Sequence, residues 1–133
     1  MYRGQILFNR TNSKELVGKT AAYRESKPMA FAGYLVRGVP NEHSNSEYLA
    51  AYMNLPQTKQ RLQNMCKNIV GMANINAKEF QKIPIPGPPK ALQDQFAKAV
   101  EVSLDHRRLL EGQLEEFSSL FGSLQHRAFT GQL

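Results

Sequence analysis

The chain has 133 residues, a length that fits one ordinary domain, and it carries a formal net charge of +6. Its single cysteine, Cys66, excludes an internal disulfide framework and a zinc site built from several cysteines. No apolar stretch approaches the roughly 20 residues that cross a membrane, and the first residues do not resemble a secretory leader. We therefore expect a cytoplasmic protein with no membrane partner.

The basic charge is concentrated in the first ninety residues. Residues 1–90 hold 13 Lys or Arg against 5 Asp or Glu, a net charge of +8, whereas residues 91–133 hold 4 against 6, a net charge of −2. A basic segment joined to a mildly acidic one favours a polyanion as the partner of the basic segment. A solvated basic surface without a partner is the alternative.

Three short strands are expected in the first forty residues, at 5–8, 17–23 and 31–39, in a small mixed or antiparallel sheet. The first strand runs directly into a polar stretch without an apolar break, made of Asn9, Arg10, Thr11, Asn12, Ser13 and Lys14. Arginine can pair with guanine through two hydrogen bonds and asparagine with adenine, while hydroxyl groups and lysine suit phosphates. The stretch is typical of a recognition loop, and a polar surface turn is the alternative.

Two helices are expected next. Ser44 and Glu47 fit a capping box, with Ser44 as the N-cap of a helix that Pro56 ends. A second helix is expected from residue 57 to about residue 69, where Cys66 serves as a small buried hydrophobe.

A short helical turn and an extended connector follow. Asn76 and Glu79 fit another capping box. Four prolines between residues 84 and 89 form a hinge or rigid spacer, because proline disfavours helix both for itself and for the residue before it. A proline-rich ligand for a signalling domain is disfavoured, since Ile83 and Ile85 indicate that the connector is packed.

From Lys90 to about Arg127 the pattern is helical, and a helix of this length would span roughly 57 Å. Apolar residues repeat with heptad spacing along one seam, while Ser103 and Arg107 interrupt it and can fix its register. Folding back onto the same chain is the alternative to pairing with another helix in a coiled coil or bundle. Pairing is favoured, because no second element follows residue 90 to cover the seam.

Catalytic motifs are absent from the sequence. It contains neither of the Gly-rich motifs that bind nucleotide phosphates. Its three histidines, His43, His106 and His126, are far apart, and Cys66 has no neighbouring His or acidic residue. We expect no catalytic residues, no metal and no cofactor.

Four segments occur in order along the chain: RTNS-x-x-LVGK at 10–19, GMANINAKEF at 71–80, IPIPGPP-x-x-LQDQF at 83–96 and LFGSLQHRAFTGQL at 120–133. Together they resemble the specificity (S) subunit of type I restriction–modification systems. The similar part is the distal half of one target-recognition domain followed by one conserved spacer helix. The resemblance implies an α+β partial recognition domain at 1–87 and a spacer helix for dimerisation and assembly at 88–133.

The resemblance also implies a non-catalytic reader of double-stranded DNA, because methyl transfer and cleavage belong to separate methyltransferase and restriction subunits of the family. It places DNA contacts on Asn9, Arg10, Thr11, Asn12, Ser13 and Lys19 and on Asn74 and Asn76. On charge alone, Lys59, Arg61 and Lys67 are candidates for phosphate contacts. The residues assigned to a homodimer and to assembly are Phe96, Leu110, Leu114, Phe117, Phe121 and Leu124.

A protein of another class fits the same sequence. A truncated remnant could dimerise through its helix and no longer read DNA. The target bases do not follow from the sequence.

Overall fold

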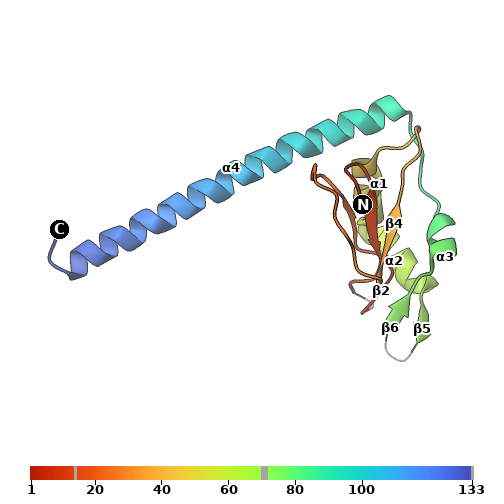
Figure 1. The fold of residues 1–133 in the computed structure, drawn as a ribbon, viewed down its shortest axis with the longest axis horizontal. Helices are drawn as coiled ribbons and strands as arrows, with labels where there is room; N and C mark the ends of the chain where they lie inside the picture. Colours follow the sequence, from red (N-terminus) through yellow and green to blue (C-terminus); the bar gives the residue numbers. More distant parts are fainter. Residues whose placement is uncertain (14, 70–71, 133) are drawn as a thin grey trace. The chain divides into compact units, whose positions relative to one another are not determined.

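The computed structural model describes residues 1–13, 15–69 and 72–132, without the side chains of 67–69, 72 and 73. The chain forms two compact units, Met1–Ala97 and Lys98–Leu133. The first combines two small sheets with helices, and the second is helical (Figure 1). The α+β class expected from the sequence is confirmed.

The first sheet has the strand order β3-β1-β4, with β1 (Ile6–Asn9), β3 (Thr20–Ala22) and β4 (Leu35–Gly38) all antiparallel. These strands correspond to the three expected ones: β1 has the expected length but begins one residue later, and β3 and β4 are shorter than expected. The helix α1 (Ser46–Met53) packs on this sheet through Ala50, which lies in a cluster with Ile6 and Ala22 (Figure 1).

A second sheet was not expected from the sequence. It has the order β2-β6-β5, with β2 (Thr11–Asn12), β5 (Lys67–Ile69) and β6 (Met72–Asn74). The expected helix at 57–69 is therefore wrong in its last residues. The helix α2 (Pro56–Met65) ends where Cys66 takes an extended backbone conformation, and the next three residues pair with β6.

Two helix boundaries also differ from the expectation. Asn45, and not Ser44, is the N-cap of α1, and its side-chain oxygen accepts a hydrogen bond of 2.9 Å from the Glu47 N–H. Pro56 is the first residue of α2 and does not merely end the helix before it. The fixed φ of proline and its missing N–H are both tolerated at this position.

Other local expectations are confirmed. The capping box at Asn76 and Glu79 opens α3 (Ala77–Gln81). The connector with the four prolines forms no helix or strand, and α4 runs from Lys90 to Phe129. Cys66 differs from the expectation of a buried residue within a helix: it follows α2, is half-buried against the main core, and its Sγ–H donates to the Leu62 carbonyl at 3.1 Å.

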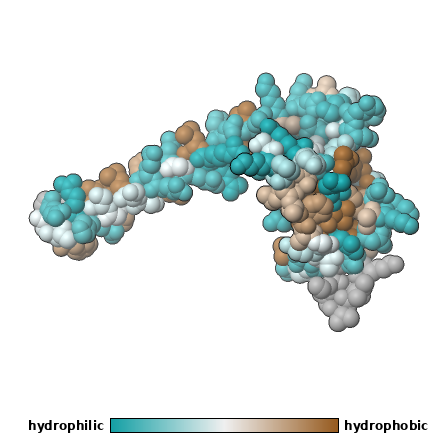
Figure 2. Space-filling view, viewed as in Figure 1, coloured by the Kyte–Doolittle hydropathy of each residue, from teal (hydrophilic) through white to brown (hydrophobic). Residues whose placement is uncertain are grey.

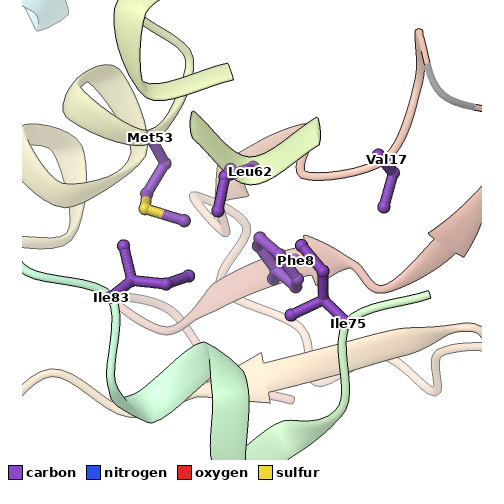
Figure 3. Packing of buried hydrophobic residues seen from close by; sticks show 6 residues of the cluster. All are labelled: Phe8, Val17, Met53, Leu62, Ile75 and Ile83. Atoms are coloured by element: carbon purple, nitrogen blue, oxygen red, sulfur yellow. The ribbon is translucent and has the colours of Figure 1, made fainter. Parts of the chain in front are cut away.

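The main core gathers side chains from segments that are far apart in the sequence. Figure 3 shows Phe8, Val17, Met53, Leu62, Ile75 and Ile83 around one centre. Phe8 also packs on Phe80, with ring centroids 4.6 Å apart. Because β1, the 15–19 turn, α1, α2 and the residue after β6 all contribute to it, this core fixes the loop that follows β1.

Gln93 attaches the first turn of α4 to the rest of the first unit. It is 3% exposed, and its Nε2 donates to the carbonyl oxygens of His43 (3.1 Å) and Pro88 (2.8 Å). Its Oε1 accepts from the Asn45 N–H at 3.0 Å. Three backbone groups from two different segments therefore depend on one side chain for their hydrogen bonds.

We expect Gln93→Leu to lower the free energy of unfolding by about 1–3 kcal/mol, because it leaves these backbone groups without partners while nearly preserving volume. Chemical denaturation followed by circular dichroism measures the change. Gln95→Leu, an exposed position on the same helix, is the matched control and should change stability little. Equal effects of the two substitutions would contradict this role of Gln93.

Gly18 makes the closest backbone approach to the core. Its φ is +79°, and a Cβ at this position would lie 2.6 Å from Leu62 Cδ1. The backbone conformation favours glycine, and the short distance leaves no space for a side chain.

We expect Gly18→Ala to destabilise the protein by about 1–3 kcal/mol from backbone strain, and by a further 1–3 kcal/mol, approximately, from overpacking against Leu62. Gly4 isolates the first contribution, since its φ is +83° and a Cβ added there would have nothing within 4 Å. Gly4→Ala should therefore cost only the strain. Comparing the two midpoints of denaturation checks this, and a Gly4→Ala effect as large as that of Gly18→Ala would refute the overpacking contribution.

Candidate nucleic-acid interface

The polar loop after β1 connects the two sheets. Asn9 ends β1 and Thr11 begins β2, so Arg10 is the only residue between the strands. The Arg10 N–H donates to the Tyr34 carbonyl at 3.1 Å, and the Arg10 carbonyl accepts from the Ile75 N–H at 2.9 Å. Backbone hydrogen bonds on both sides of Arg10 thus give its side chain a fixed starting point.

The Arg10 side chain is half-buried, and its Nε has no hydrogen-bond partner in the described part of the chain. The same holds for the buried Oδ1 of Asn9. A buried polar atom without a partner costs free energy that a bound ligand can recover. Each of these two neighbouring residues therefore carries one buried polar atom that the described part of the fold leaves without a partner.

Other residues of the loop form hydrogen bonds within the fold. Thr11 Oγ1 donates to Asn74 Oδ1 at 3.2 Å, which links β2 to β6. Asn12 Oδ1 accepts from the Ser13 N–H at 2.8 Å. The Ser13 carbonyl accepts from the N–H groups of residues 16 and 17, which closes the turn. The structure thus brings Thr11 and Asn74 together, and it gives Asn12 and Ser13 local structural contacts.

Asn76 has a structural contact of its own. Its Oδ1 accepts from the N–H groups of Lys78 (2.9 Å) and Glu79 (3.0 Å), as the N-cap of α3. Lys14 and the side chain of Lys67 lie outside the described residues, although the Lys67 backbone pairs with Asn74 in the β5–β6 ladder.

The lysines expected to contact DNA differ in their surroundings. Lys19 is exposed and Lys59 is half-buried on α2. Partial burial, and then the positive charge of Lys19, lower the pKa of Lys59 from its ordinary value. Arg61 is exposed two positions further along α2, about 200° around the helix from Lys59. The structure therefore brings Lys19 and Lys59 together but separates Arg61 from them.

The apolar residues of α4 fall into two groups. Phe96, in the first unit, packs edge-to-face on the Tyr48 ring with centroids 6.2 Å apart. The other five residues of the expected seam lie in the second unit and are exposed. Their exposed fractions are 64% for Leu110, 66% for Leu114, 69% for Phe117, 62% for Phe121 and 42% for Leu124. Figure 2 shows brown apolar side chains spaced among polar ones along this helix.

Among the described residues, no group of three or more His, Cys, Asp or Glu side chains could hold a metal ion. Within the same part of the chain, no helix is long and apolar enough to span a bilayer.

Sequence reasoning did not anticipate the roles of Tyr34, Ile75 and Gln93. Tyr34 and Ile75 hold Arg10 through their backbones, which leave no side-chain signal in the sequence. Gln93 does have a signal, because it lies in the LQDQF segment, which starts three residues after the last proline, in the first turn of the expected helix.

No protein-family model matches the sequence. Among curated proteins, the chain is 34% identical over 103 residues to a protein of Methanocaldococcus jannaschii named as the specificity subunit of the type I restriction enzyme MjaX. The similarity covers 71% of this chain, and it spans 23% of the length of that relative. The resemblance inferred from the four sequence segments is thereby confirmed, and this chain is related to a part of the specificity subunits of type I restriction enzymes.

Proposed function

We propose that this chain reads part of a DNA target as a partial specificity subunit of a type I restriction–modification complex. The observation that carries the proposal is the 34% identity to a specificity subunit over 71% of the chain. The loop at residues 9–13 supports it, because Arg10 is held by backbone hydrogen bonds on both sides while its Nε has no partner in the described structure. A residue that recognises DNA bases needs such a fixed backbone and a side-chain donor that forms no hydrogen bond within the fold.

In this proposal the chain is not an enzyme. Separate methyltransferase and restriction subunits carry out methyl transfer and cleavage, and they are its protein partners in the cytoplasm. Residues 1–87 form the DNA-reading domain and residues 88–133 the spacer helix. Double-stranded DNA is the ligand of the first domain, which supplies nearly all of the net charge of +8 carried by residues 1–90.

A selection from random DNA duplexes tests the function. The chain is assembled with the methyltransferase subunit of its own system, and the bound duplexes are sequenced. Enrichment of a defined base pattern is the expected result. Retention of duplexes without any enriched pattern would contradict sequence reading.

Arg10 is the residue to which we assign base recognition. If it pairs with a guanine through two hydrogen bonds, Arg10→Ala in the assembled complex should cost roughly 1–3 kcal/mol and relax the preference at one base position. Arg10→Lys is the matched control for charge: it should keep the electrostatic attraction but lose the preference, since lysine cannot make the paired contact.

Binding of both variants to a set of duplexes with single base changes separates the roles. Arg61→Ala, which removes an exposed charge on α2, should weaken all duplexes about equally. A uniform loss for Arg10→Ala, with no change in base preference, would show that Arg10 contacts phosphate.

We further propose that the chain forms a homodimer through the second unit. Five large apolar side chains there share one seam and are at least 42% exposed. Monomers rarely leave so large a continuous apolar surface in water. The same observation supports the rival function, a helix-mediated interaction protein that no longer reads DNA.

We expect light scattering of the purified chain at micromolar concentration to give the mass of two chains. Leu110→Glu with Phe117→Glu should give the mass of one, because each places a charge in the seam. Ser119→Glu adds the same charge outside the seam and should leave the dimer intact. A wild-type mass of one chain without aggregation would refute dimerisation.

A further inference from the structure

Two lysines, Lys19 and Lys59, are held next to each other by the core contact of Gly18. Gly18 lies against Leu62, so the backbone of the following residue, Lys19, runs beside α2. Lys59 is three positions before Leu62 on α2 and therefore lies one turn away on the same side of the helix. Neither position can move away easily, because the Gly18–Leu62 contact belongs to the core.

Neither ammonium group has an acidic partner in the part of the chain that the structure describes. Acidic residues do compensate other cations of the first unit: Arg24 pairs with Glu47, and Lys90 pairs with Asp94. Lys19 and Lys59 lie close enough for the charge of Lys19 to act on Lys59, and the described residues supply neither with an acidic partner. Partial burial and the charge of Lys19 lower the pKa of Lys59, so the protonated pair destabilises the fold.

Lys19 is also connected to the base of the recognition loop. Its carbonyl accepts from the Asn9 N–H at 2.9 Å, and the Gly18 N–H donates to the Asn9 carbonyl at 2.8 Å. An anion bound by Lys19 would therefore lie at a fixed position relative to the backbone from which Arg10 extends. Contacts to phosphate set the position of a protein on the duplex, whereas contacts to bases supply specificity.

We propose that Lys19 and Lys59 together bind a single backbone phosphate of DNA and so set the position of the loop that carries Arg10. This inference rests on the proposed DNA-reading function. Lysine suits this role because its compact ammonium group binds phosphate as a point charge without reading a base. Lys19, which the sequence resemblance places among DNA contacts without a defined role, becomes an anchoring residue, and Arg61 is excluded from this site by its place on α2.

Three variants test the proposal in the assembled complex: Lys19→Met, Lys59→Met and the double substitution. If both lysines bind one phosphate, each single variant should lower the salt slope of DNA binding by about 1, and the double variant should lower it by about 1 as well. Base preference should stay unchanged in all three. Two outcomes would overturn the shared site. One is a salt slope of the variants equal to that of the wild type; the other is a decrease in slope for the double variant that is twice the decrease for each single variant.

A second measurement uses the full chain alone and does not depend on sequence reading. Sodium phosphate should raise the thermal midpoint of the wild type more than sodium chloride of the same ionic strength, because phosphate binds the folded state. Lys59→Met should lose this difference and should itself be more stable than the wild type in chloride, since it removes a charge that burial and Lys19 disfavour.

Arg61→Met is the control, and it should keep the phosphate response. An equal phosphate response in Lys59→Met and the wild type would overturn the site even if the complex reads DNA. Conversely, a complex without base preference whose Lys59→Met variant loses the phosphate response would refute the reading function and leave the anion site in place.

Discussion

The contact between Gly18 and Leu62 is the constraint on which the arrangement of the first unit depends. It requires a residue without a side chain and with a positive φ at one point of the chain, and it places Val17 in the core beside Phe8. The Gly18 N–H in turn holds the end of β1 through the Asn9 carbonyl. Three features with different physical origins, namely backbone conformation, apolar packing and a backbone hydrogen bond, therefore fix the same turn.

The polar residues near this turn and the second sheet fall into two groups, which differ in whether their side chains form hydrogen bonds within the fold. Thr11, Asn12, Asn74 and Asn76 use side-chain oxygens for hydrogen bonds that maintain the second sheet, the turn and the N-terminus of α3. Arg10 keeps an unpartnered Nε in the described structure. From the sequence alone, all these residues are equally good candidates for DNA contacts. The hydrogen bonds of the structure leave Arg10 as the best candidate for base recognition. A DNA contact by the others would compete with the bonds they already make.

The sequence predicts best those features that depend on near neighbours. The Asn76 capping box, the start of α4 at Lys90 and the strand around Phe8 follow from spacing within a few residues, and the structure has all three. The second sheet could not be foreseen, because β2 pairs with a strand about sixty residues later in the chain. Its residues carry no alternation of their own, and the helical pattern before them continues without a break. At 67–69, pairing with the nearby strand β6, which itself pairs with β2, overrides the local helical preference.

The surroundings of Arg10 also could be predicted from the sequence only in part. Its residue type and its place after a strand can be read from the sequence, and they suffice to nominate it. What holds it, however, is a pair of backbone groups: the Tyr34 carbonyl, which any residue could supply, and the Ile75 N–H, which any residue except proline could supply. At Tyr34, and at Ile75 where the apolar volume in the core is kept, substitutions should leave both bonds intact, whereas a change in the length of either neighbouring loop would displace one of them. The geometry around Arg10 is therefore determined by the lengths of the segments that return to it more than by their side chains.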